Sequence, residues 1–235
     1  MKFKFKWLKM KDEGAIGIGA MIVFIAMVLV AGIAASVFIQ SANTIQLQAM
    51  STGQETQQEV SSGIDVFDIE GKINVTNGTT YDLKYLVIGV QTRPGSPEID
   101  LNETYIILSN GDTEALLRYG GYNTSLNIYV GLSSTTGDIF ALLNTTSWNN
   151  VDRETYGLAV MQDADGSLKE TKPVLNRGDK AILFVRCSAD NDGTFGTEIA
   201  ERTIVFGQVV PEVGSPGVIQ FTTPRSYFDA IYDLQ

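Results

Sequence analysis

Histidine is absent from this chain of 235 residues, which removes the commonest general base and metal ligand near neutral pH. The chain also has no GxSxG motif, no phosphate-binding loop and no Cys/His cluster. Its paired carboxylates occur only in segments that resemble turns. The sequence therefore predicts that the protein is not an enzyme and carries no cofactor.

Cysteine occurs only once, as Cys187, so no disulfide can form within the chain. A domain exported to an oxidising compartment would have to rely on its hydrophobic core alone. Cys187 ends the apolar run Ala181–Cys187, and this placement favours a buried or edge position over a reactive thiol.

Charge is missing from the 41 residues between Gly14 and Gln54. The first part of this zone, Ala15–Ile39, is an apolar run of 25 residues, and a helix of roughly 20 such residues spans a bilayer. Five lysines precede the run, at positions 2, 4, 6, 9 and 11. Because basic residues stay on the cytoplasmic side, we expect the N-terminus inside the cell and the body of the chain outside.

The helical pattern continues beyond the apolar run. Phe38, Ala42, Ile45 and Ala49 lie on one face of a helix, and Ser61-Ser62-Gly63 is a stop signal. A helix that begins at residue 15 and ends near residue 60 would be about 69 Å long, roughly twice the length that a membrane requires. Such a helix projects beyond its own domain and cannot be buried by it.

The composition of this helix favours burial against other helices. Gln40–Gln54 is polar through Gln, Ser and Thr rather than through charge, and amides and hydroxyls find partners between packed helices. Ala31 with Ala35, and Gly32 with Ser36, are pairs of small residues spaced four apart, which let two helix backbones approach. The run is too long for a cleaved secretory signal. An uncut membrane anchor stays open at this point.

The N-terminal residues resemble those of a known family. Lys11-Asp12-Glu13-Gly14 followed by AIGIGAMIVFIAMVLVAGIAASV is similar to the start of archaeal flagellins (archaellins), which belong to the type IV pilin-like filament subunits. The resemblance implies that a prepilin peptidase cuts between Gly14 and Ala15 and removes the basic leader as a class III signal peptide. Bacterial type IV pilins usually have glutamate at the fifth residue after the cut, whereas this chain has Gly19. The segments RPGSPEIDLNET (93–104) and TTPRSYFD (222–229) are also archaellin-like.

The resemblance implies a structural subunit of the archaeal flagellum (archaellum) filament, which polymerises with itself and with other archaellins for swimming motility and surface adhesion. It implies a precursor in the cytoplasmic membrane, an assembly platform with an ATPase, and an extracellular filament. A non-motile adhesion pilin and a membrane-anchored surface β-domain that does not polymerise are the alternatives. The sequence itself predicts no nucleic-acid partner, because the net charge is −10 and nucleic-acid binding needs a basic face.

The rest of the chain predicts an antiparallel β-domain, because short alternating or apolar runs are separated by Gly, Asn and Asp. The expected strands are 64–69, 73–75, 81–90, 104–108, 126–130, 139–143, 156–161, 180–187 and 202–210, followed by an edge strand at 218–221 and a short tail at 227–234. Those at 64–69 and 73–75 would join near Gly71. We therefore expect an α+β protein: leader 1–14, hydrophobic helix 15–62, and an Ig-like β-sandwich at 63–235.

Two acidic segments are similar to parts of calcium-binding loops. Asp163-Ala-Asp165-Gly and Asp190-Asn-Asp192-Gly both lack an aspartate at the first position of the EF-hand pattern. β-Turns explain both segments more simply. A stabilising divalent cation at Asp163 and Asp165, or at Asp190 and Asp192, is kept as a hypothesis.

Five Asn-X-Ser/Thr sequons lie between residues 74 and 146, where chance in a chain of this composition would give about two in total. Their asparagines are Asn74, Asn77, Asn102, Asn123 and Asn144. The excess predicts N-glycosylation of at least one of them on one face or end of the β-domain.

Overall fold

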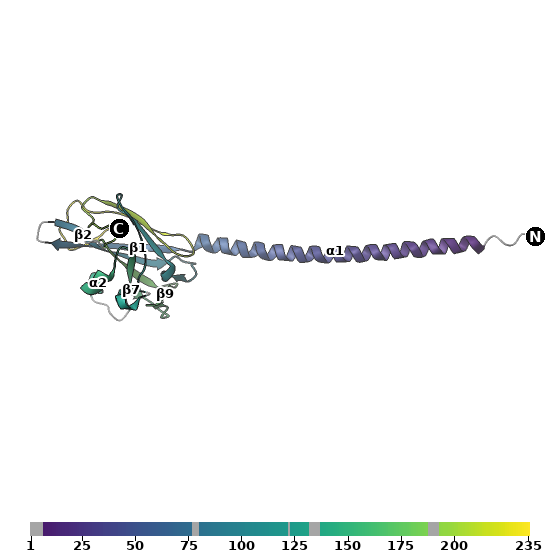
Figure 1. Ribbon diagram of the computed structural model, residues 1–235, viewed down its shortest axis with the longest axis horizontal. Coiled ribbons are helices and arrows are strands. Elements are labelled where there is room, and N and C mark those ends of the chain that lie inside the picture. Colours follow the sequence, from purple (N-terminus) through teal and green to yellow (C-terminus); the bar gives the residue numbers. More distant parts are fainter. Residues whose placement is uncertain (1–6, 77–79, 122, 132–136, 188–192) are drawn as a thin grey trace, which may run out of the picture. The chain divides into compact units, whose positions relative to one another are not determined.

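The computed structural model describes residues 7–76, 80–121, 123–131, 137–187 and 193–235. The chain divides into two compact units, Met1–Glu55 and Thr56–Gln235. Helix α1, Trp7–Ser61, is a single uninterrupted α-helix of 55 residues (Figure 1). It is longer than predicted because it begins within the leader, and it ends at the predicted stop, where the Ser62 N–H donates to the Gln58 carbonyl oxygen at 2.8 Å.

The second unit is built mainly of β-strands. They are β1 Ile64–Thr76, β2 Thr80–Thr92, β3 Ile99–Asp100, β4 Tyr105–Ser109, β5 Glu114–Tyr119, β6 Tyr129–Val130, β7 Thr155–Gln162, β8 Leu168–Lys169, β9 Lys172–Leu175, β10 Lys180–Arg186, β11 Ile204–Val210, β12 Gly217–Thr222 and β13 Ile231–Asp233. The other elements are the short helix α2, Thr145–Asn150, and 3₁₀ turns at Leu101–Glu103, Thr124–Leu126 and Ile139–Ala141.

One 10-stranded sheet contains most of these strands, in the order β12-β11-β4-β5-β7-β10-β2-β1-β13, with β6 also paired to β7. Its pairings are antiparallel except for those of β5 and β6 with β7. A small second sheet has the order β3-β9-β8. The predicted fold class, one long helix followed by a mainly antiparallel β-domain, is therefore confirmed.

The large sheet folds over a single core, so that the β12-β11-β4-β5 half packs against the half that contains β7, β10, β2 and β1. Buried residues of both halves share one cluster, among them Leu108 and Val205 from the first and Ile69 and Leu183 from the second. Cys187 lies in this core as predicted, and burial raises the pKa of its thiol to about 12.

A second hydrophobic cluster covers the other face of the β7-β10-β2 half. Phe140 and Trp148, from the segment around α2, pack with Val87 of β2 and Phe184 of β10. The Trp148 ring lies edge-on to that of Phe184, with 5.2 Å between the ring centroids. This half of the sheet is thus buried on both faces by the domain itself.

Several local predictions are wrong. The two strands expected to join near Gly71 are one strand, β1. A Cβ at Gly71 would lie 2.3 Å from a Leu83 methyl carbon, so close packing rather than a turn explains the glycine. The predicted strand 139–143 begins as a 3₁₀ turn capped by Asp138, and 126–130 contains only the two-residue β6. Strands β3, β5, β8, β9 and β13 and helix α2 were not predicted.

Candidate functional site

Helix α1 exposes a large number of apolar side chains. Every side chain from Gly14 to Ser61 is exposed in the isolated chain, and Phe38 has 75% of its surface exposed. The apolar side chains of the first part lie on all sides of the helix rather than on one stripe. A helix that is apolar all round needs an apolar environment on every side, which is either lipid or other helices.

The segment Gly14–Ser61 is long and apolar enough to cross a membrane by length and composition. The predicted cleavage point, Gly14-Ala15, lies inside α1, before the apolar run. Glycine in a helix interior costs about 1 kcal/mol relative to alanine, which makes local unwinding at this bond easier. Cleavage between these two residues stays a prediction.

The four predicted packing residues, Ala31, Gly32, Ala35 and Ser36, all lie in α1 and are exposed. Residues four apart in a helix lie one turn apart on the same face, so the two pairs form two neighbouring rows, which together make a strip of small side chains. A Cβ at Gly32 would have no atom within 4 Å, so the backbone is open to approach here. Packing of another helix on this strip stays a prediction.

The polar second half of α1 satisfies some of its hydroxyl groups internally. Thr44 Oγ1 donates to the Gln40 carbonyl oxygen at 3.0 Å, and Ser51 Oγ donates to Glu55 Oε1 at 3.0 Å. A hydroxyl that already donates within its own helix costs less to bury than one that must leave water unpaired. The internal hydrogen bonds therefore make this stretch better suited to burial than its polarity suggests.

The two residues after α1 are held tightly by the β-domain. The Gly63 N–H donates to Ser96 Oγ at 2.9 Å, and the Gly63 carbonyl oxygen accepts from the Arg93 N–H at 2.9 Å. The Ser215 N–H and Oγ both donate to the Ser62 carbonyl oxygen, at 2.9 Å each. The archaellin-like segment 93–104 thus contributes Arg93 and Ser96 to this junction, a role that its sequence did not reveal.

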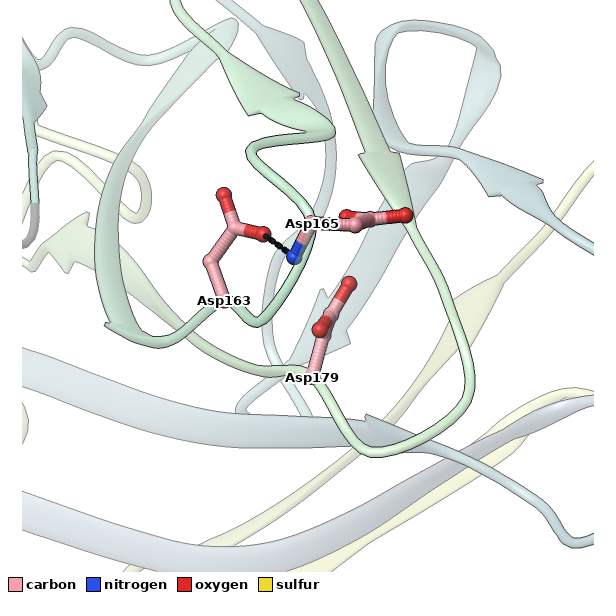
Figure 2. A group of neighbouring side chains, drawn as sticks. All are labelled: Asp163, Asp165 and Asp179. Atoms are coloured by element: carbon pink, nitrogen blue, oxygen red, sulfur yellow. Dashed lines mark hydrogen bonds between the residues drawn. The ribbon is translucent and has the colours of Figure 1, made fainter.

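The predicted acidic pair Asp163 and Asp165 lies beside a third carboxylate, Asp179, which sequence reasoning missed (Figure 2). Ligand oxygens of the three lie within 4.8 Å of one another. Asp163 Oδ1 accepts from the Asp165 N–H at 3.2 Å, as Figure 2 shows. It also accepts from the Gly166 N–H at 2.7 Å, which is the expected turn. The other predicted pair, Asp190 and Asp192, lies outside the described residues.

Asn176 extends this acidic cluster. Its Nδ2 donates to Asp165 Oδ2 at 2.7 Å, whereas its Oδ1 is buried without a hydrogen-bond partner among the described residues. Hydrogen bonds from Ser167 and Asn176 lower the pKa of Asp165. Carboxylate and amide oxygens are the ligands that Ca²⁺ takes. Binding of a divalent cation here stays a prediction, because turn hydrogen bonds already account for Asp163.

The described sequons differ in their surroundings. Asn123 and Asn144 are exposed, and each side chain accepts a hydrogen bond from the backbone N–H of a following serine. Asn102 is half-buried, and the hydroxyl-bearing residue of its sequon, Thr104, is fully buried. Asn74 lies in β1, and Asn77 lies outside the described residues. Exposure therefore favours Asn123 and Asn144 among the candidates, and glycosylation itself stays a prediction.

Comparison with known proteins adds a family to this geometry. The family model for archaeal-type flagellin matches residues 14–221. Flagellin B3 of Thermococcus kodakarensis is 38% identical over 260 residues, which covers 96% of this chain and 99% of the relative. Flagellin B2 of Methanocaldococcus jannaschii is 41% identical over 223 residues, which covers 95% of this chain and 94% of the relative.

Solved structures give the same result. The crystal structure of archaeal flagellin FlaB1 from Methanocaldococcus jannaschii matches with a TM-score of 0.60 at 33% identity, and the match covers 74% of this chain and 97% of that one. The archaeal flagellum of Methanospirillum hungatei matches with a TM-score of 0.56 at 14% identity, over 90% of this chain and 95% of that one. The second likeness concerns the fold alone.

We expect Gly63→Ala to lower the free energy of unfolding of the β-domain by about 2 to 4 kcal/mol. Gly63 has φ +152°, and an added Cβ would lie 2.3 Å from the Ser215 carbonyl oxygen. Gly95→Ala is the matched control, because Gly95 has φ +96° but open space around it, and should cost only about 1 to 2 kcal/mol. Urea unfolding followed by the fluorescence of buried Trp148 measures both. Equal losses would show that the contact with Ser215 contributes nothing.

The cation prediction is tested by melting the protein in EDTA and again after Ca²⁺ is restored. We expect EDTA to lower the Tm and Ca²⁺ to restore it, because a cation would offset repulsion among Asp163, Asp165 and Asp179. Asp179→Asn, which removes one charge at nearly constant shape, should reduce the response to Ca²⁺. A wild-type Tm that is the same in both conditions would leave the cluster as a turn and nothing more.

Proposed function

The chain belongs to the archaeal-type flagellin family, and from this premise we propose that it is a structural subunit of an archaellum filament that polymerises through helix α1. The observation that carries the proposal is the exposure of α1, whose apolar side chains are uncovered from Gly14 to Ser61. The family is a structural one rather than a family of enzymes. We accordingly assign the subunit no catalytic step.

Polymerisation covers the apolar helix after it leaves the membrane, where it would otherwise be exposed to water. Before assembly, a bilayer of about 30 Å covers roughly 20 residues of a helix, which is less than half of α1. In the filament, the helices of many copies bundle in the core and cover one another, and the β-domains lie outside. The charge-free stretch up to Gln54 supports this arrangement, because no ion has to be stripped of water along it.

The transfer from membrane to filament exchanges one apolar environment for another. Lipid tails are about as apolar as leucine, so the hydrophobic effect contributes little to the exchange. What favours the filament is close packing along the strip Ala31, Gly32, Ala35 and Ser36, where small side chains allow backbones to approach. Subunit extraction is driven by a separate ATPase on a membrane assembly platform.

Processing prepares the helix for this transfer. The precursor lies in the cytoplasmic membrane with its N-terminus inside, anchored by the five leader lysines. A prepilin peptidase cuts after Gly14, and the loss of the lysines with Asp12 and Glu13 changes the net charge from −10 to −13. The cut removes every charge ahead of the apolar run except the new α-amino group.

The assembled filament serves swimming motility, with surface adhesion as a second role. A non-motile adhesion pilin would use the same leader and helix, and the archaeal-type flagellin family favours the motile assignment. A membrane-anchored β-domain that never polymerises would keep its leader, and this difference separates it from a filament subunit.

N-terminal sequencing of filaments sheared from cells should find Ala15 as the first residue. We expect Gly14→Val to block the cut, so that the product begins at Met1, stays in the membrane and yields no filaments, because the peptidase requires the small residue. Glu13→Gln is the control, since it changes the neighbouring residue and leaves Gly14 intact. Filaments that begin at Met1, or a mature protein found only as a lipid-bound monomer, would contradict the proposal.

The intact mass of filament protein tests the sequons. We expect a mass above that of residues 15–235 alone, because exposed Asn123 and Asn144 present sequons to a glycosyltransferase outside the cell. Asn123→Gln and Asn144→Gln should each lower the excess if that site is used, whereas Asn102→Gln should leave it unchanged. A mass equal to that of the bare chain would remove the glycosylation prediction.

A further inference from the structure

The outward face of the β12-β11-β4-β5 half exposes several large apolar side chains. Leu116 of β5 is 58% exposed, Phe206 of β11 is 51% exposed, and Val218 of β12 is 64% exposed. Ile204 and Tyr105, at 57% and 40%, belong to the same half. We call these five residues the outer apolar face.

The strand register places these side chains in neighbouring rows. Ile107 of β4 lies opposite Leu116 on one side and opposite Gln208 on the other, and Gln208 lies opposite Val218. Side chains directly opposite on one face of a sheet are about 4.5 to 5.5 Å apart at Cβ. Leu116, Ile107 and Val218 therefore form a row interrupted only by Gln208, and Phe206 lies one row away. A hollow of about 450 Å³ opens beside Leu116, between Tyr105, Arg118 and Glu154.

Among the described residues, the domain covers the corresponding face of its other half but not this one. On the β7-β10-β2 half, Phe140 and Trp148 bury Val87 and Phe184. On the β12-β11-β4-β5 half, the alternate residues point inward to the core and the outer apolar face remains exposed. Monomeric soluble domains rarely leave large apolar areas uncovered, and such areas mark interaction surfaces.

Charge indicates what kind of partner fits. Residues 64–235 contain 12 basic and 23 acidic side chains, a net charge of −11, so two copies of the domain repel each other over most of their surfaces. The four strands of this half contain only Glu114 and Arg118 among charged residues, which cancel. The outer apolar face is thus a neutral area where two such acidic domains can touch without placing like charges together.

We propose that the outer apolar face binds the β-domain of a neighbouring copy of this chain in the filament. The inference rests on the proposed polymerisation through α1, which brings the β-domains of adjacent copies within reach of one another. Tethering by packed helices gives each domain an effective concentration of the order of mM for its neighbour, so a face too weak to hold two free molecules is occupied in the filament. Contacts in a helical filament are head-to-tail, so this face meets a different surface of the next copy.

Thiol labelling tests this contact directly. Cys187 is buried, so a cysteine introduced on the outer apolar face is the thiol that a charged, water-soluble maleimide reaches in the folded protein. Leu116→Cys and Val218→Cys place that thiol on two different strands. Thr171→Cys, in the exposed turn between β8 and β9, is the control that shows that the reagent reaches assembled filaments. Each variant is labelled as filaments and as full-length subunits held apart in detergent.

We expect labelling at positions 116 and 218 to be at least about tenfold slower in filaments than in separated subunits, because reaction requires access to the thiolate. Slowing of less than about tenfold at both positions would overturn the inference, and would leave the face open to solvent or to a different partner. Slow labelling already in separated subunits would also overturn it, because the chain itself would then cover the face.

Two readouts separate this inference from the proposed function. Electron microscopy of the wild type shows whether filaments form at all, and their absence would count against polymerisation itself. Normal filaments with rapid labelling at 116 and 218 would overturn only the contact between β-domains. Cys187 serves as the folding control, because labelling of Cys187 before denaturant is added would identify a variant that has unfolded. If one of the variants Leu116→Cys and Val218→Cys is unfolded, the other decides the outcome.

Discussion

A single constraint governs this protein: the first half of helix α1 is apolar on all sides, and no described residue of its own chain covers it. Covering one large apolar side chain is worth about 1.5 to 3 kcal/mol, and α1 exposes such side chains along most of its length. A free monomer in water would aggregate. The lipid bilayer and a bundle of identical helices are two environments that meet the constraint, and the proposed life of the subunit is a passage from the first to the second.

The β-domain has its own hydrophobic core, which does not include the apolar part of α1. Its core is closed by a sheet folded on itself, and a second cluster around Trp148 covers one outer face. The junction at Ser62 and Gly63 is held by hydrogen bonds from the segment 93–96 and from Ser215. The β-domain therefore buries its own apolar residues, whereas the apolar residues of α1 have to be covered by lipid or by other copies.

The sequence predicted the features that depend on composition and period. The uncharged run, the small-residue pairs and the β-character of the domain followed from residue types alone, and the comparisons confirm the family that the first residues suggested. Local structure was less accessible where tertiary contacts override pattern. Residues 139–143 are as apolar as a strand, yet Asp138 caps a 3₁₀ turn there because Phe140 has to reach the Trp148 cluster. Asp179 lies far from Asp163 and Asp165 in the sequence, so no local motif predicts that it belongs to the acidic cluster.

The absence of charge from Gly14 to Gln54 has a consequence for how a filament of this subunit meets its surroundings. At 0.1 M ionic strength, dissolved ions screen interactions between exposed charges that lie more than about 10 Å apart. This part of the helix carries no charges that could be screened. The acidic β-domains, by contrast, repel each other less as salinity rises. In the proposed filament, rising salinity would therefore weaken the repulsion between neighbouring β-domains, whereas the uncharged stretch of the helices holds no charges for salt to screen.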